Sequence, residues 1–557
     1  MKSKRIIALM ATLLISGSTV GAFAGCGGSA VSNNGYDKTK ANLSVATYDG
    51  GVGSAWLEEA AARFEKLHET STHFQSGRTG VKINIDPDKV KYQGPNIEQK
   101  ALNKDMYFSE GFDYYNIVNQ GKAADITDVM TGSMSAYNES GTIADKLDSN
   151  VKSFLTAKDG KYYMVPFYDG FYGFVYDIDL FESEGFYFDK DGDFLRLVTE
   201  GQRAEFEANK SNGPDGVKGT YDDGLPATYE QMIALADYIV SKSYIPFCYA
   251  GGGAVKGEYV TKACRSFIAD YEGYDSFKLN YTLDGTATLV KEINADGTLV
   301  TEEVEITQAN GYELQRQAGK YYALKMQEEL FGSVKYIGGS WNAYDYTDAQ
   351  TNFIMSKYAG AGKRYAMLLE GVWWENEADN VFTDMEILKG EKKSERRFGF
   401  LPMPKVNEEA AGAQTMFSGG VSFGFINSNC ENMELAKEFM RFLHTDAEMS
   451  KFSSKTSISR SFNYTVKEED KVKATSFGKA VIEMRSQAKV VYPHSALDLI
   501  INNAATFDAS QWYTNSTING KDTKDVFAAF KDGTATAETY FKGFYTYQQK
   551  NWSNLQK

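Results

Sequence analysis

Residues 42–67, NLSVATYDGGVGSAWLEEAAARFEKL, set the fold class. The first seven residues alternate and are rich in β-formers, which predicts a strand over residues 42–48. The turn DGGVG at residues 49–53 follows, and apolar residues then recur at helical spacing over residues 55–67. This order of strand, turn and helix is typical of an α/β protein.

The same alternation continues downstream. We expect a strand at residues 81–85, a helix at residues 97–107 and another strand at residues 114–118. Strands separated by helices predict a parallel sheet with helices on both faces. Ligands of such sheets bind beyond the carboxyl ends of the strands, which is where Asp49 would lie.

The composition limits the class of protein. A chain of 557 residues is too long for one ordinary core and predicts several domains or two large lobes with insertions. The formal charge of −15 disfavours nucleic acid as a partner, because an acidic surface repels phosphates. Hydrophobic residues make up 42% of the chain, which excludes general disorder. Aromatic residues make up 14%, and rings with a polar group suit surfaces that are partly wet and partly apolar.

The N-terminus predicts export. Positive charges in residues 2–5 precede an apolar run at residues 6–15, and small residues follow, as in a secretory signal. The run is too short to cross a membrane as a permanent helix. Residues 23–26, FAGC, resemble a bacterial lipobox, so we expect lipidation at Cys26. Residues 27–40 are rich in Gly, Ser and Asn and would form a flexible tether at the extracellular face of the bacterial cell membrane.

The other cysteines do not form a disulfide framework. Removal of Cys26 from the count leaves Cys248, Cys264 and Cys430, and an odd number argues against complete pairing. Cys248 and Cys264 either pair or act as small buried hydrophobic residues.

Sequence motifs of enzymes are missing. The chain has only four His and lacks HExxH, GxSxG, GxxxxGK[ST] and CxxC. We therefore expect a protein that is not an enzyme and assign no catalytic residue. A glycoside hydrolase needs only two suitably spaced carboxylates, so a lipid-anchored glycan-active hydrolase stays an alternative.

Two Asp-rich segments are candidate metal sites. Asp189, Asp191 and Asp193 alternate and Glu200 is twelfth in the same count, which is the ligand spacing of a calcium loop, although Phe194 stands where that loop has Gly. Clustered carboxylates repel one another unless a cation lies between them; a solvated acidic loop is the alternative. We expect structural calcium, with candidate ligands Asp189, Asp191, Asp193, Asp215, Asp222 and Asp223.

Aromatic residues in Gly- or Ser-bearing contexts are the best sign of a ligand. Flat rings beside polar groups suit sugars, whose C–H faces stack on rings while their hydroxyls bond to polar side chains. For any single ring, packing in the core is the alternative. The group comprises Tyr168, Phe171, Tyr172, Trp341, Trp373, Trp374, Phe417, Trp512 and Tyr513.

The order of these segments resembles the extracellular solute-binding lipoproteins of carbohydrate ABC importers, the group that includes maltose-binding protein. The resemblance extends over nearly the whole mature chain, and its order and spacing are more specific than any single piece. Besides the lipobox, it rests on NLSVATYDGG at 42–51, DGKYYMVPF at 159–167, GFVYDIDLFE at 173–182, LPATYEQMIALADYI at 225–239, YAMLLEGVWWEN at 365–376, FGFLPMP at 398–404 and SGGVSFGFINSNCENMELAKEFMRFL at 418–443.

The resemblance implies a two-lobed α/β fold of the periplasmic-binding-protein type, with a hinge and a central ligand cleft. Crossing segments would fall near residues 166–172, 417–421 and 459–464. The implied organisation is a signal peptide at 1–25, a lipid-anchored flexible tether at 26–41, an N-terminal lobe at 42–167 plus 419–462, and a C-terminal lobe at 168–418 plus 463–557 with insertions at 189–223 and 248–338.

The implied function is capture of an oligosaccharide and its delivery to the membrane permease of an ABC importer by closure of the hinge. A peptide-binding lipoprotein is an alternative, and it would need charged groups for the peptide termini. By position, Asp49 would bond sugar hydroxyls, Tyr168 and Asp169 would lie at the hinge, and Trp373 would stack on sugar. The full candidate ligand-binding set is Asp49, Tyr168, Asp169, Tyr172, Trp341, Trp373, Trp374, Phe417, Ser418, Trp512 and Tyr513.

Overall fold

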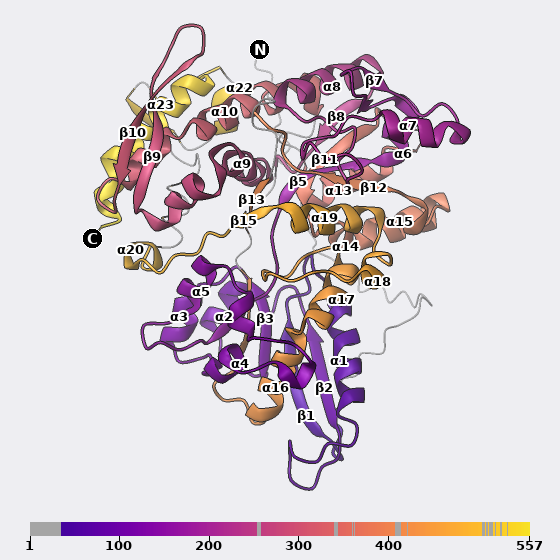
Figure 1. The fold of residues 1–557 in the computed structure, drawn as a ribbon, viewed down its shortest axis with the longest axis vertical. Helices are drawn as coiled ribbons and strands as arrows, with labels where there is room; N and C mark the ends of the chain where they lie inside the picture. Colours follow the sequence, from indigo (N-terminus) through magenta and orange to yellow (C-terminus); the bar gives the residue numbers. More distant parts are fainter. Residues whose placement is uncertain are drawn as a thin grey trace, which may run out of the picture.

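The computed structural model places two sheets one above the other, with helices around each (Figure 1). We call the part built on the first sheet the first lobe and the part built on the second sheet the second lobe. The structure describes residues 35–556 except 253–257, 339–343, 359, 361, 407–413, 420–421, 504–506, 508–510, 512–515, 519, 524–525 and 532.

The first lobe is built on a five-stranded sheet in the order β2-β1-β3-β14-β4. The first three strands in the chain pair in parallel, and β14 is antiparallel to β3 and β4. Residues 41, 43 and 45–47 of β1 are buried. Helix α16 packs on β1 and helix α1 packs on β2, and their apolar faces close this core. The strands are β1 (Ala41–Thr47), β2 (Val81–Pro87), β3 (Met106–Glu110), β4 (Met164–Pro166) and β14 (Ser422–Ile426).

Helices surround this sheet in the lower half of Figure 1. The longest, α1, follows the predicted turn after β1, and α16 presents buried apolar residues at every third or fourth position. The helices are α1 (Ala55–Leu67), α2 (Gly94–Gln99), α3 (Tyr114–Asn119), α4 (Thr127–Thr131), α5 (Ser149–Leu155), α16 (Met433–Leu443) and α17 (Asp446–Thr456).

Two predictions in the first lobe were wrong. Residues 106 and 107, predicted as the end of a helix over 97–107, instead begin strand β3, because the backbone of this segment pairs with both β1 and β14. Residues 114–119 form helix α3 rather than a strand. The cause is local: the carboxylate of Asp113 accepts hydrogen bonds from the backbone N–H groups of Tyr115 and Asn116 and so caps the helix.

The second lobe contains a four-stranded sheet in the order β12-β5-β11-β8. Strand β11 is buried along its whole length, is parallel to β8 and is antiparallel to β5. Helices α8, α13 and α19 pack on this sheet. The elements are β5 (Tyr172–Asp177), α6 (Ile178–Glu184), α8 (Tyr229–Ser241), β8 (Ile245–Cys248), α13 (Tyr346–Met355), β11 (Tyr365–Gly371), α14 (Trp374–Glu377), α15 (Asp379–Lys389), β12 (Phe398–Leu401), α18 (Glu468–Lys471) and α19 (Ser476–Gln487).

A helical layer and a β-hairpin extend the second lobe at the upper left of Figure 1. Their apolar side chains join the core of the second sheet. Helix α9 turns sharply at Gly273, whose φ of 74° favours glycine. The remaining elements are β6 (Tyr187–Phe188), β7 (Phe194–Leu195), α7 (Arg203–Asn209), α9 (Glu258–Thr282), β9 (Gly285–Ile293), β10 (Leu299–Ile306), α10 (Ala318–Met326), α11 (Val334–Ile337), β13 (Thr415–Phe417), β15 (Lys489–Val491), α20 (Asp498–Ile501), β16 (Ser516–Ile518), β17 (Lys521–Thr523), α22 (Val526–Lys531) and α23 (Ala537–Asn551).

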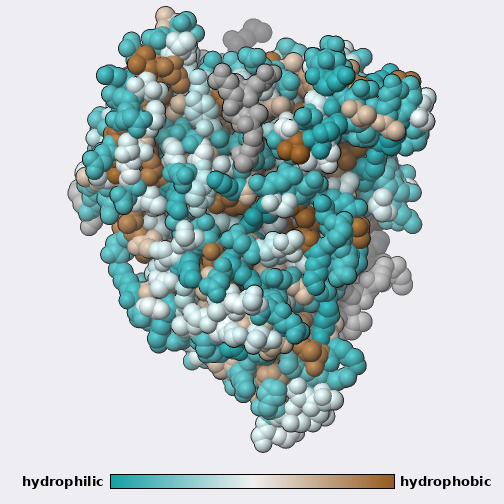
Figure 2. All heavy atoms as spheres, in the orientation of Figure 1, coloured by the Kyte–Doolittle hydropathy of each residue, from teal (hydrophilic) through white to brown (hydrophobic). Residues whose placement is uncertain are grey.

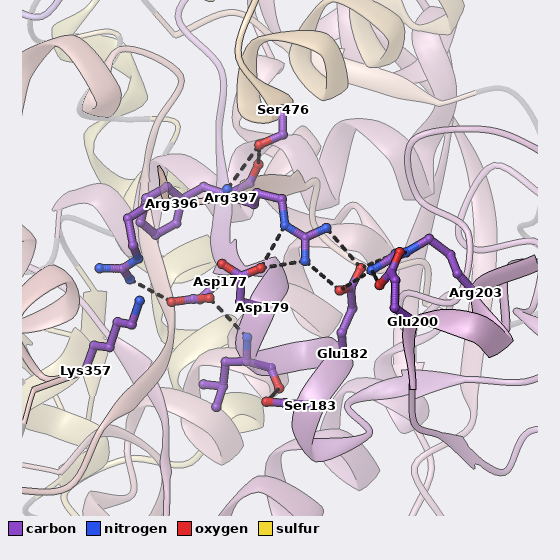
Figure 3. Close-up of polar contacts among 12 residues, drawn as sticks. Asp177, Asp179, Glu182, Ser183, Glu200, Arg203, Lys357, Arg396, Arg397 and Ser476 are labelled. Atoms are coloured by element: carbon purple, nitrogen blue, oxygen red, sulfur yellow. Dashed lines mark hydrogen bonds and ion pairs between the residues drawn. The ribbon is translucent and has the colours of Figure 1, made fainter. Parts of the chain in front are cut away.

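A network of ion pairs connects helices α6 and α7 with the edge of the second sheet (Figure 3). The carboxylate of Glu182 on α6 bonds the guanidinium groups of Arg203 on α7 and Arg397 beside β12, at 2.9 and 2.6 Å. Asp177, at the end of β5, likewise bridges Arg364 and Arg396 at 2.6 and 2.7 Å. These pairs join segments that are far apart in the sequence.

The exterior seen in Figure 2 is mainly hydrophilic, with hydrophobic residues scattered singly or in small groups. Within the described part of the chain, no helix combines the length and apolar character that crossing a membrane requires. Both observations concern the folded lobes, since the predicted signal and Cys26 lie outside the described residues.

Candidate ligand site between the lobes

Three segments cross between the lobes, and they touch one another. The first runs from β4 to β5, the second from β13 to β14, and the third from α17 to α18. The backbone N–H of Asp169 donates to Ser459 O at 2.8 Å, and that of Gly419 donates to Gly170 O at 2.8 Å. These contacts join the segments into one hinge.

Asp169 and Ser418 lie inside this hinge. Both are buried, and the carboxylate of Asp169 accepts a 2.7 Å hydrogen bond from Nε of Arg485. Burial raises the pKa of Asp169, and the Arg485 charge opposes that rise. The hydroxyl of Ser418 accepts from the backbone N–H of Gly170 at 3.0 Å. The structure therefore places both side chains among the crossing segments, where the resemblance implied that Asp169 would lie. The assignment of Asp169 and Ser418 as ligand-binding residues stays a prediction.

On the first lobe, polar groups gather at the carboxyl ends of β1 and β3. Tyr48 and Asp49 follow β1, and Glu110 ends β3. The hydroxyl of Tyr168 donates a hydrogen bond to the carboxylate of Glu110. Burial raises the pKa of Glu110, although bonds from Tyr168 and Tyr48 oppose this. This edge is where a parallel sheet places its ligand.

On the second lobe, Trp373 faces this edge. A Cβ added at Gly51 of the first lobe would lie 2.5 Å from the indole, so the Asp49 turn and the tryptophan are in close contact. The ring of Tyr172 meets Trp373 edge-on, with centroids 5.0 Å apart, and Tyr259 of α9 packs on Tyr172 at 5.4 Å. Aromatic rings of the second lobe thus lie against the turn that follows β1 of the first lobe.

Charged groups from both lobes meet beside Trp373. Nζ of Lys89, in the loop after β2, is 3.3 Å from the carboxylate of Glu377 and 3.3 Å from the hydroxyl of Tyr346. The amide of Gln350 donates to Glu377 at 3.0 Å and to the buried Glu370 at 3.4 Å. Burial and the Glu377 charge raise the pKa of Glu370 well above its usual range. Rings, carboxyl groups and an ammonium together can recognise a ligand rich in hydroxyl groups.

Sequence reasoning missed most of these polar groups. A position near the end of an apolar strand was the available signal for Glu110, in β3, and for Glu370, in β11. Lys89 and Glu377 are 288 residues apart, and Tyr259 lies in a segment that we treated as an insertion. The missed residues are Tyr48, Lys89, Glu110, Tyr259, Gln350, Glu370 and Glu377.

Other predicted ligand-binding residues lie elsewhere. Trp374 is fully buried and packs on Phe398 of β12 at 5.0 Å, so it belongs to the second lobe's core. Phe417 is also fully buried and stacks on Tyr281 at 6.2 Å. These placements correct the expectation that both rings face ligand. Trp341, Trp512 and Tyr513 lie outside the described residues.

The predicted calcium ligands fall in two places. Asp189 accepts the backbone N–H groups of Asp191 and Asp193 at 2.9 Å in the turn between β6 and β7, which is ordinary turn chemistry. Asp222 is fully buried, and its carboxylate accepts the backbone N–H of Asp215 at 3.0 Å. Among the described residues, no three His, Cys, Asp or Glu are grouped as a metal site.

A cavity of about 500 Å³ opens on the first lobe's sheet, away from Trp373 and the crossing segments. Its walls include Asn42, Asn84, Asp105 and Asn427. It is therefore a separate feature from the interface between the lobes.

Comparison with known proteins gives the fold. No protein-family model and no curated protein matches the chain. Among solved structures, a chitin oligosaccharide binding protein is 15% identical with a TM-score of 0.50, over 92% of this chain and 99% of that one. The bacterial solute receptor AcbH, with a preference for β-D-galactopyranose, is 14% identical with a TM-score of 0.48, over 92% and 99%. The maltose-maltodextrin binding protein of Alicyclobacillus acidocaldarius is 14% identical with a TM-score of 0.49, over 93% and 100%. The first of these likenesses shows that the chain has the two-lobed α/β fold of periplasmic solute-binding proteins.

Proposed function

We propose that the protein is an extracytoplasmic binding protein that captures an oligosaccharide and delivers it to the permease of an ABC importer. The observation that carries this proposal is the contact of Trp373 with the Asp49 turn, between two lobes joined by three crossing segments. A ring on one lobe and hydrogen-bonding groups on the other can hold opposite sides of a sugar. The chitin oligosaccharide binding protein, which shares the fold, adds support for this class of ligand.

Closure of the hinge would couple binding to transport. A ligand shifts the balance between open and closed lobes only if it contacts the closed state better. The contacts of Lys89 with Glu377 and of Gly51 with Trp373 require the lobes to be close together. A sugar bridging Glu110 and Trp373 would therefore favour closure, and the closed protein would dock on the permease.

Export and anchoring complete the proposal. Residues 1–25 would direct secretion and be removed, and lipidated Cys26 with the tether at 26–41 would hold the lobes at the outer face of the cell membrane. Lipidation is tested by mass spectrometry of the membrane-extracted protein. The expected result is an acylated N-terminal Cys26, and a mature chain without acyl groups would contradict the anchor.

Calcium is proposed for the second Asp-rich cluster. Burial and the charge of Asp215 raise the pKa of Asp222 to about 7, as expected where two carboxylates lie close together. Oδ2 of Asp215 and Oδ1 of Asp223 are buried without a hydrogen-bond partner in the described part of the chain. Hard carboxylate oxygens of this kind suit calcium, which would hold the loop together.

The proposed function is tested by a ligand panel. Thermal unfolding of the full chain is followed with neutral oligosaccharides of different linkage and with peptides, and hits are titrated by calorimetry. The expected result is a rise in Tm with one class of oligosaccharide, because the ligand binds only the folded state. Stabilisation by peptides alone, or release of shorter sugars during incubation, would favour the peptide-binding or the hydrolase alternative instead.

A further inference from the structure

The indole of Trp373 lies directly against backbone from both lobes. A Cβ added at Gly51 of the first lobe would be 2.5 Å from Cγ and Cδ1 of the ring, which is much closer than packed carbon atoms approach. A Cβ added at Gly371 of the second lobe would be 2.3 Å from Cζ2. One glycine thus meets the pyrrole part of the indole, and the other meets its benzene part.

The backbone conformation does not require glycine at either place. Neither Gly51 nor Gly371 has a positive φ, so a residue with a side chain could adopt the same backbone without strain. What glycine permits here is the close approach of the ring. A methyl group at Gly51 would therefore act on the contact with Trp373 and not on the turn itself.

Second-lobe groups hold the indole in place from the other side. Tyr172 meets the ring edge-on with centroids 5.0 Å apart, and Tyr259 does so at 6.3 Å. Tyr172 is buried on β5, so it cannot move away easily. Because these rings and Gly371 back the indole, a side chain at Gly51 would push the lobes apart rather than displace Trp373 within its own lobe.

A polar contact beside the indole keeps the lobes in this arrangement. Nζ of Lys89 on the first lobe is 3.3 Å from the carboxylate of Glu377 and 3.3 Å from the hydroxyl of Tyr346 on the second lobe. The side chain of Lys89 is 42% exposed, so water screens the pair and it holds the lobes only weakly. The arrangement with Trp373 on Gly51 is therefore one from which the lobes can separate.

We propose that the contact of Trp373 with Gly51 is autoinhibitory, because the Asp49 turn covers the face of the ring on which a sugar would stack. The inference rests on the proposed function for the class of ligand. A stacked sugar needs about 3.5–4.0 Å between its carbons and the ring, and Gly51 leaves no such room. A bound sugar would still draw open lobes together, but to a wider separation than the one seen here.

The contact is tested without sugar by hydroxyl-radical footprinting of the full chain, with oxidation of each tryptophan read by mass spectrometry. Gly51→Ala should raise the oxidation rate of Trp373 severalfold, while the fully buried Trp374 stays unreactive as the internal reference. Lys89→Met adds no group at the turn but weakens the contact between the lobes, so it should raise the rate even if Gly51→Ala does not fold.

The matched control is Gly201→Ala. It adds the same methyl group at an exposed position, where the nearest atom would be 3.9 Å away, and it should leave the oxidation of Trp373 unchanged. Equal oxidation of Trp373 in wild type, Gly51→Ala and Lys89→Met would overturn the proposal, because the ring would then not be covered by the turn in solution.

Calorimetry with neutral oligosaccharides, such as maltotriose and chitotriose, shows whether the contact opposes binding or belongs to the bound state. Autoinhibition predicts that Gly51→Ala binds sugar about threefold or more tightly than wild type, because the binding-competent fraction rises. An equal or weaker affinity in Gly51→Ala would overturn the autoinhibition alone. If neither protein binds any oligosaccharide, the proposed function fails and the autoinhibition fails with it.

Discussion

The carboxylate of Asp169 accepts a 2.7 Å hydrogen bond from Nε of Arg485, and this ion pair joins the first crossing segment to α19 of the second lobe. The Asp169 side chain is fully buried and that of Arg485 is 15% exposed, so water screens the pair poorly. The same carboxylate receives a weaker bond from Ser418 Oγ at 3.4 Å. One acid thus links two crossing segments with a helix of the second lobe.

Loss of this acid should destabilise the fold strongly. Asp169→Ala leaves the Arg485 charge buried and unpaired, and we expect the free energy of unfolding in urea to fall by about 3–5 kcal/mol. Glu538→Ala, which breaks the exposed pair with Lys542, is the matched control and should cost less than about 1 kcal/mol. Equal losses in the two variants would contradict the role assigned to Asp169.

The neighbouring tryptophans should separate binding from stability. Trp373→Ala removes the ring that faces the first lobe, and we expect oligosaccharide affinity by calorimetry to fall about tenfold or more, equivalent to about 1.4 kcal/mol. Trp374→Ala removes a core ring and should lower the free energy of unfolding by about 3–5 kcal/mol. The Trp374→Ala protein that remains folded should bind the oligosaccharide with the affinity of wild type. A loss of affinity confined to Trp374→Ala would reverse these assignments.

The sequence predicts β1, the Asp49 turn and α1 well, because their alternation and helical spacing are local properties. It fails at residues 106–119, where pairing with β14 and the Asp113 cap decide between strand and helix. The sequence also cannot distinguish Trp373 from Trp374, because the two residues are adjacent and identical. Trp374 is the buried one, and this depends on its packing against Phe398, which is distant in the sequence. The contact of Lys89 with Glu377 has no local signal at all.

The network at Glu182 should make stability depend on pH. Although burial opposes ionisation, hydrogen bonds from Arg203 and Arg397 lower the pKa of Glu182 from 4.5 to about 2. Because the folded pKa lies below the unfolded one, the stabilisation is present above pH 4.5 and is lost as the pH falls from 4.5 towards 2. Urea unfolding across this range should show wild type converging on Glu182→Gln. A constant difference between the two would exclude Glu182 as the titrating group.

Removal of the proposed calcium should destabilise the segment around Asp215 and Asp222. We expect a chelator to lower the Tm of the full chain and added calcium to restore it, because a cation relieves the repulsion between two crowded carboxylates. Asp215→Asn should make Tm insensitive to both additions. Asp191→Asn, in the exposed turn between β6 and β7, should keep the calcium response, since Asp189 there bonds backbone N–H groups. Loss of the response in Asp191→Asn alone would move the metal to the first Asp-rich segment, and a chelator without effect on wild type would remove it altogether.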